Sequence, residues 1–333
     1  MSKAQLNPLP GLVQDFFAQH LLAERHLSPC TISSYGDSIR LLVNYVENQT
    51  HRCASEQRLE DWDATCILGF LEHLEKERHC CPRTRNVRLA AIHSFMKYLC
   101  RRCPQSMALA QRVLAIPSKR HAQPLMGYLS AQEVQAILEV PSALTHSGRR
   151  DRLMFQLLYN TGARVSELVA LNRQDFDRTA RSVALHGKGR KERTVPLWSK
   201  IARQVWRWLD QLPPGPSTPV FTNRFGSRVS RSGVEKRLRQ AAHQAAKVCA
   251  SLRTRRVSPH LFRHTTAMHL LQSSVDITSI ALWLGHASIL TTHKYLEADL
   301  EMKRKTLNHL KEPNIKPVTY QPKDRLLAFL EAL

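Results

Sequence analysis

The chain has 333 residues, 43% of them hydrophobic, which is long and apolar enough for two folded domains. It carries 49 Lys and Arg against 27 Asp and Glu, a formal surplus of 22 positive charges spread along most of the sequence. Such a surface favours a polyanionic partner, with nucleic acid ahead of an anionic membrane. No apolar run reaches the roughly 18 residues of a membrane span, and the first residues lack the layout of a secretory signal. We therefore expect a cytoplasmic protein that does not engage a membrane.

The eight cysteines are expected to be reduced in such a protein. Cys100 and Cys103 form a CxxC pair, and His79, Cys80 and Cys81 lie not far before it. This second group lacks the spacing of metal ligands, so a zinc site is not favoured. Several cysteines occupy apolar positions of predicted helices. We expect them to be small buried hydrophobic side chains.

The pattern of the first third, residues 1–116, predicts a helical bundle. Ser28 followed by Pro29 is a typical helix start, and apolar residues recur after it at helical spacing. Further helices are predicted at about 63–77 and after Pro82. The inward face of the last of these comprises Ile92, Phe95, Met96 and Leu99.

The segment 117–127, PSKRHAQPLMG, is predicted to be a linker because it contains two prolines, a glycine and three basic residues.

A second, mixed domain is predicted at 128–312, and a tail with a short amphipathic helix at 313–333. Within the second domain, SVALHGKGRKERTVPL predicts a β-hairpin with a Gly-Lys-Gly turn. Helices are predicted before it, ending at Gly162, and after it at about 199–211, 230–249, 259–272, 276–284 and 288–297. The fold class is thus mainly α with a small β-sheet.

The stretch SPHLFRHTTAMHLL contains His260 and His264 at the spacing of a zinc-protease helix. That chemistry needs a glutamate beside the first histidine, where this chain has Leu261, and Arg263 would repel a dication. A phosphate fits better. Pro259 predicts a helix start, so His260 and Arg263 share one face near the positive end of that helix. We interpret His264 as a packed structural histidine and expect no metal.

Three other segments contain groups suited to the same anion. TGARVSEL places Arg164 after a helix-ending glycine, with Glu167 three residues later. HGKGRKER places Lys188 at the predicted hairpin tip, and WLGHASILTTHKYLEADL contains His286 and a later Tyr295. Each has an ordinary explanation by itself: a surface ion pair worth under about 1 kcal/mol, a solvated lysine, a helix cap or a core tyrosine.

The order of these segments, TGAR-VSEL, GKG, HLFRH, LGH and then a tyrosine, resembles the tyrosine recombinases. This family includes phage integrases and bacterial chromosome-dimer resolvases. The resemblance covers roughly residues 7–310 and is weaker in the helical first third. It implies an N-terminal helical core-binding (SAM-like) domain and a mixed α/β tyrosine-recombinase catalytic domain, which together clamp duplex DNA. Carried over by position, the resemblance implies that Tyr295 is the nucleophile and that Glu167 is a supporting acid. The residues that it implies for activating the phosphate are Arg164, Lys188, His260, Arg263 and His286.

The reaction implied by the resemblance is attack of the Tyr295 hydroxyl on a DNA phosphodiester, which gives a 3′-phosphotyrosine and a free 5′-hydroxyl. Lys188 is the candidate general acid, and His260 is a candidate for moving the tyrosine proton. We expect neither ATP nor a metal or other cofactor. The expected partners are double-stranded DNA of the bacterial nucleoid, further copies of this chain up to a tetramer in synapsis, and related recombinase subunits.

The biological task is left open by the sequence. We favour integration and excision of a mobile element, because the chain is so basic and extends well past Tyr295. The alternatives are resolution of chromosome or plasmid dimers, a type IB topoisomerase-like relaxing activity, and a non-catalytic DNA-binding regulator.

Two basic groups are candidate DNA contacts outside the reacting centre. They are Arg83, Arg85 and Arg88 in the helix after Pro82, and Arg253, Arg255 and Arg256 before the histidine helix. The alternative for each residue is a solvated helix or loop surface.

Overall fold

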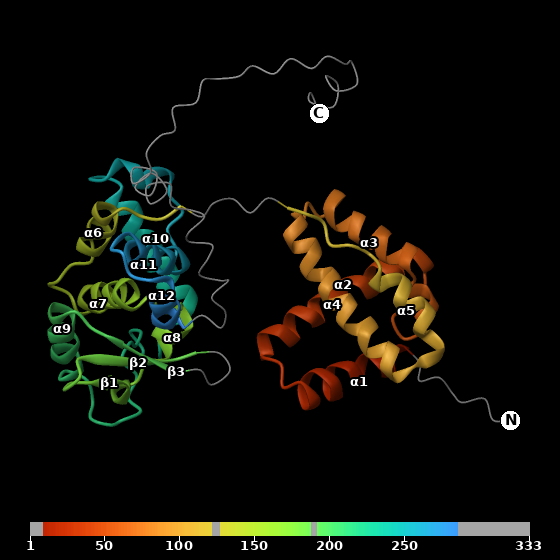
Figure 1. Ribbon diagram of the computed structural model, residues 1–333, viewed down its shortest axis with the longest axis horizontal. Coiled ribbons are helices and arrows are strands. Elements are labelled where there is room, and N and C mark those ends of the chain that lie inside the picture. Colours follow the sequence, from red (N-terminus) through yellow and green to blue (C-terminus); the bar gives the residue numbers. More distant parts are fainter. Residues whose placement is uncertain (1–8, 122–126, 188–191, 286–333) are drawn as a thin grey trace, which may run out of the picture. The chain divides into compact units, whose positions relative to one another are not determined.

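The structure is a computed structural model that describes residues 9–121, 127–187 and 192–285. The chain divides into two compact units, residues 1–124 and 125–333 (Figure 1). The described part of the first unit contains helices and no strand, and the second combines helices with a small antiparallel sheet. The predicted fold class, mainly α with a little β, is confirmed.

The first unit begins its helices where local sequence signals place them. Ser28 caps the second helix, its hydroxyl accepting a hydrogen bond from the Thr31 amide at 3.3 Å, and Pro29 occupies the first turn. Asp63 caps the next helix in the same way. The α-helices of this unit are α1 (Leu9–Asp15), α2 (Pro29–Thr50), α3 (Ala64–Lys76), α4 (Pro82–Arg102) and α5 (Met107–Leu114). A π-helical segment (Phe16–Glu24) and two 3-10 turns (Leu59–Trp62 and Pro104–Ser106) connect them.

The core of the first unit is aromatic at its centre. The Phe95 ring contacts Phe16 and Trp62, with centroid separations of 5.2 Å and 5.5 Å. Its neighbours Ile92, Met96 and Leu99, predicted to face inward, are fully buried. This burial of large apolar side chains along one face of α4 is the main force that holds the helices together.

The second unit begins with a capping box, which the sequence Ser130-Ala-Gln-Glu133 predicts. The Ser130 hydroxyl accepts from the Glu133 amide, and the Glu133 carboxylate accepts from the Ser130 amide. The α-helices of this unit are α6 (Ala131–Glu139), α7 (His146–Thr161), α8 (Val165–Ala170), α9 (Ser199–Leu209), α10 (Arg231–Ala245), α11 (Pro259–Gln272) and α12 (Ile277–Leu284). Two 3-10 turns, Arg173–Asp175 and Ala250–Thr254, complete its described helical elements.

The predicted hairpin is confirmed as β2 (Ser182–His186) and β3 (Glu192–Pro196), paired antiparallel with Val183 opposite Val195. A third strand, β1 (Phe176–Asp177), pairs with the other edge of β2. Sequence reasoning missed it because two residues carry no detectable alternation. Of the residues predicted for the turn, Lys188 and Gly189 lie outside the described ranges.

The sheet lies at one edge of the second unit, beside α8 and α12 (Figure 1). α8 packs near β2, and α12 packs near β3. α11 contacts α7, α10 and α12. Its Phe262 joins the central core, and its Ala267 and Leu271 form a smaller apolar cluster with Ile280 and Leu284 of α12. The C-terminal end of α7, the start of α8 and the end of α12 therefore come together with β3. In the described ranges no helix has the length and apolar character needed to cross a membrane.

The cysteines are less buried than expected. All eight are free thiols, and three of them, Cys30, Cys53 and Cys81, are exposed. The other five are partly buried and pack against the two cores. The expectation of small buried hydrophobic residues therefore holds only in part, because these five border a core and none of the eight is fully buried.

Two of these thiols should differ sharply in reactivity. The hydrogen bond with the Thr84 hydroxyl holds the pKa of the exposed Cys81 below its usual range, whereas burial raises the pKa of Cys66 to about 11. Because the thiolate is the nucleophile, iodoacetamide at pH 7.5 should alkylate Cys81 much faster than Cys66, as followed by peptide mass spectrometry. Thr84→Val should slow Cys81, whereas Thr84→Ser, which keeps the hydroxyl, should not. Equal rates at the two thiols would contradict this assignment.

Candidate active site

Arg164 lies at the junction of α7 and α8, where it is the N-cap residue of α8. Its Nη1 donates to Glu167 Oε1 at 2.6 Å, and its backbone amide donates to Glu167 Oε2 at 2.8 Å. Its Nη2 donates to the Gly285 carbonyl at 3.3 Å. The side chain nevertheless remains 41% exposed. The guanidinium is thus fixed on one side by the protein and open to solvent on the other, where a phosphate can approach it.

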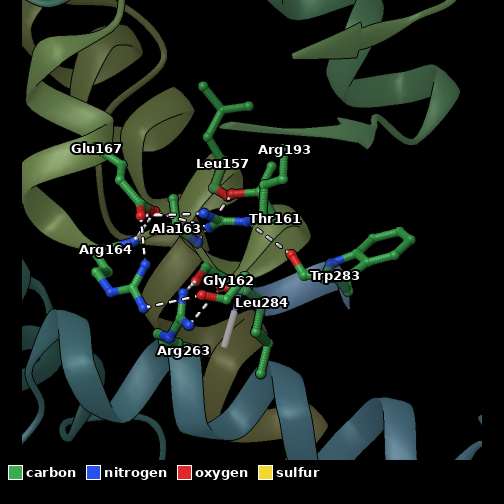
Figure 2. Close-up of polar contacts among 11 residues, drawn as sticks. Leu157, Thr161, Gly162, Ala163, Arg164, Glu167, Arg193, Arg263, Trp283 and Leu284 are labelled. Atoms are coloured by element: carbon green, nitrogen blue, oxygen red, sulfur yellow. Dashed lines mark hydrogen bonds and ion pairs between the residues drawn. The ribbon is translucent and has the colours of Figure 1, made fainter. Parts of the chain in front are cut away.

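Arg263 approaches the same junction from α11, although it is distant in sequence. It is 4% exposed, and its Nη1 and Nη2 donate to the carbonyls of Gly162 and Leu284 at 2.7 Å and 2.6 Å. Gly162 directly precedes the Ala163–Arg164 pair, so the two predicted arginines meet at the α7–α8 turn and the end of α12. Figure 2 shows the Arg263 guanidinium beside these two carbonyls, with Arg164 next to it.

Glu167 is the buried acid that both sides of the junction share. It is 3% exposed, and each of its oxygens accepts from two donors supplied by Arg164 and Arg193. Burial by itself would raise the pKa of this carboxyl, but the hydrogen bonds from Arg193 and Arg164 outweigh burial and hold the pKa below its usual value. Glu167 is therefore a carboxylate at neutral pH.

Arg193 belongs to this network and was missed by sequence reasoning. Its Nη1 and Nη2 donate to Glu167 Oε1 and Oε2 at 3.1 Å and 2.8 Å, and its Nε donates to the Trp283 carbonyl at 2.9 Å. A signal was available, because Arg193 shares its strand face with Val195, which is buried. An arginine at an inward-facing strand position predicts a buried acid as its partner.

The predicted start of the histidine helix is confirmed. The Ser258 hydroxyl caps α11 by accepting from the Leu261 amide, and Pro259 occupies the first turn. His260 follows and is exposed. His264, expected to be a packed histidine, is 4% exposed.

Three predicted site residues, Lys188, His286 and Tyr295, lie outside the described ranges. Two of them are close in sequence to residues of the described site. Lys188 precedes β3, which carries Arg193, and His286 directly follows Gly285, whose carbonyl accepts from Arg164. Among the described residues, no group of three or more His, Cys, Asp or Glu side chains is arranged to hold a metal ion.

The structure separates the six predicted DNA-contacting arginines. Arg85 is 5% exposed and donates to the Pro117 carbonyl, and the partly buried Arg88 donates to the Ser38 hydroxyl. Both already serve as internal donors of the first unit. The exposed residues are Arg83, Arg253, Arg255 and Arg256, although Arg255 Nε also lies 3.7 Å from the buried Glu133 Oε1. These four remain the better candidates for phosphate contacts.

Comparison with known proteins identifies the class of this two-unit chain. Residues 127–302 match the model of the phage integrase family, and residues 14–103 match the phage integrase N-terminal SAM-like domain. The chain therefore belongs to the phage integrase family, the tyrosine recombinases, and is a DNA breaking and rejoining enzyme. The resemblance noted in the sequence is confirmed, including the SAM-like first domain.

Individual relatives cover nearly the whole chain. A Sinorhizobium fredii protein named as an integrase/recombinase, y4rC, is 41% identical over 98% of this chain and 98% of its own length. The tyrosine recombinase XerC of Pelobacter propionicus is 33% identical over 86% of this chain and 90% of its own. Among solved structures, the XerH site-specific recombinase bound to a palindromic difH substrate aligns with a TM-score of 0.69. It is 21% identical and covers 86% of this chain and 81% of that one, which shows a shared fold.

The α7–α8 turn should be sensitive to a single methyl group. Gly162 has φ +60°, and a Cβ built there would lie 2.5 Å from Leu284 Cδ2. Gly162→Ala should lower the free energy of unfolding by at least about 2 kcal/mol, from left-handed strain plus overpacking. Urea unfolding of the full chain measures the loss.

Gly226→Ala is the matched control, because Gly226 has φ +79° but nothing within 4 Å of the added Cβ. It should show the strain alone, about 1 kcal/mol. Equal losses in the two variants would mean that the contact with α12 does not constrain the turn.

Proposed function

We propose that this chain is a site-specific recombinase that cuts and rejoins duplex DNA through a 3′-phosphotyrosine at Tyr295. The observation that supports this most strongly is the convergence of Arg164 and Arg263 on the α7–α8 turn, with Glu167 buried behind them. Two fixed guanidinium groups of this kind suit the non-bridging oxygens of a phosphodiester, on which charge builds in the transition state.

The proposed cleavage step forms a bond between the Tyr295 oxygen and phosphorus and breaks the bond to the 5′-oxygen. Ionising a tyrosine at pH 7 in water costs about 4 kcal/mol, because its reference pKa is about 10. The cationic cluster lowers that cost, and His260 receives the phenolic proton. Lys188 gives a proton to the leaving 5′-oxygen. His286 completes the set around the phosphate.

Rejoining reverses these bonds with a 5′-hydroxyl from a partner duplex, so the number of phosphodiester bonds is unchanged. The energy of the cleaved bond is kept in the phosphotyrosine, and the step therefore requires no ATP. The positive charge on the phosphate comes from the protein side chains, and the proposed reaction includes no metal ion. The substrate is duplex DNA, and exchange between two duplexes requires four protomers.

We propose integration and excision of a mobile element as the task of this recombinase. The relative from Sinorhizobium fredii, named as an integrase/recombinase, supports this assignment over nearly the full length. The similarity to XerC supports the second candidate, resolution of chromosome or plasmid dimers. Sequencing the DNA covalently attached to the protein in cells separates them. Sites that flank the protein's own gene favour a mobile element, and a single chromosomal or plasmid site favours a resolvase.

A nicked duplex carrying the mapped site tests the chemistry. On this substrate the strand beyond the nick diffuses away after cleavage, so the covalent intermediate accumulates. The wild type should form a covalent protein–DNA band on denaturing gels, with or without EDTA, whereas Tyr295→Phe, which removes the attacking oxygen, should form none. Gel-shift assays should show that both proteins bind the uncut site.

Tyr320→Phe is a matched control, since it removes a hydroxyl from a tyrosine outside the predicted motifs. It should be trapped like the wild type. Covalent trapping of Tyr295→Phe, or a strict requirement for a divalent ion, would contradict the proposed mechanism.

A further inference from the structure

Arg193 links three elements that carry the candidate site. It stands on β3, its two terminal nitrogens bind both oxygens of Glu167 in α8, and its Nε binds the Trp283 carbonyl near the end of α12. Its side chain is only 10% exposed. The guanidinium is thus directed into the protein, unlike that of Arg164 (Figure 2).

Through Glu167, Arg193 determines where the guanidinium of Arg164 lies. Arg164 Nη1 is bound to Glu167 Oε1, the same oxygen that accepts from Arg193 Nη1. A bidentate arginine–carboxylate pair fixes the plane of the carboxylate as well as its position. Without Arg193, one face of this buried carboxylate would lose its donors, and the group would turn toward Arg164 or toward water.

Arg193 also holds the end of α12. Trp283, Leu284 and Gly285 offer their carbonyls to Arg193, Arg263 and Arg164 in that order. Close packing adds to this bond, because a Cβ on Gly285 would lie 3.0 Å from Arg193 Cδ and Nη1. The next residue in the chain is His286, so the position of this helix end bears directly on that predicted site residue.

We propose that Arg193 is a positioning residue for DNA cleavage: it sets Arg164 through Glu167 and the end of α12 through Trp283, and does not itself bind the phosphate. This inference rests on the proposed function, since it assigns to Arg164 a role in cleavage. It predicts that loss of Arg193 slows the chemical step and leaves DNA affinity nearly unchanged.

The test uses full-length protein on the nicked duplex, with DNA affinity measured by gel shift and covalent trapping measured at saturating protein. Arg193→Gln should bind DNA within about twofold of wild type and cleave about 100-fold more slowly, the loss expected for a displaced catalytic group. Arg193→Lys should lose roughly tenfold, because one ammonium can hold Glu167 but cannot also reach the second oxygen and Trp283. Arg203→Gln, which removes an exposed guanidinium from α9, is the charge-matched control and should cleave at the wild-type rate.

A double variant separates positioning from a direct DNA contact. If Arg193 acts through Glu167, Arg193→Gln combined with Glu167→Gln should be about as slow as the slower single variant, because both remove one shared network. Multiplied losses, wild-type cleavage by Arg193→Gln, or a loss of DNA affinity equal to the loss of rate would each overturn the inference. Circular dichroism and thermal unfolding establish whether the variants are folded. If Arg193→Gln does not fold, the cleavage rate of Arg193→Lys is the test.

Failure of this inference is distinguishable from failure of the proposed function. If the wild type itself forms no covalent complex, the recombinase mechanism is wrong. If the wild type is trapped and Arg193→Gln is trapped equally fast, only the role of Arg193 is wrong.

Discussion

The candidate site depends on the C-terminal end of α12, where three consecutive carbonyls each accept from a different arginine. A helix leaves its last carbonyls without partners inside the helix, and its C-terminus carries partial negative charge. Here Arg193, Arg263 and Arg164 supply the missing donors. Three cations can therefore gather in a small volume, because the helix end and the buried Glu167 offset their mutual repulsion.

Glu167 is the second constraint, since its carboxylate holds the guanidinium groups of Arg164 and Arg193 next to each other. Burying a carboxylate is costly unless it is paired and fully hydrogen-bonded, and Glu167 meets that condition with donors from both Arg164 and Arg193. Removing one partner of such a buried pair typically costs about 3–5 kcal/mol. The same contacts that stabilise the second unit thus also hold Arg164 ready to meet a phosphate from the solvent side.

The α7–α8 turn connects this network to the rest of the fold. Gly162 ends α7 in the left-handed conformation, and its carbonyl accepts from Arg263 while its Cα faces Leu284. The Thr266 hydroxyl of α11 donates to the Tyr159 carbonyl of α7 just before the turn. α7, α11 and α12 are therefore locked together at the point where the guanidinium groups meet, which suits a site that must be rigid before DNA binds.

The sequence by itself determined the local features of this protein: the helix starts at Ser28 and Ser130, the end of α7 at Gly162, the β2–β3 hairpin and the segments that contain the candidate site. These follow from hydrogen bonds and periodicities within a few residues, which the sequence displays directly. It also indicated the family through the order of its motifs. Only the tertiary structure decided which arginines act together. Arg193 binds Glu167, and Arg85 donates to the Pro117 carbonyl. Both contacts join residues that are far apart in the chain. Side-chain partners at such separations are set by how the helices and strands pack, and no local pattern encodes that packing.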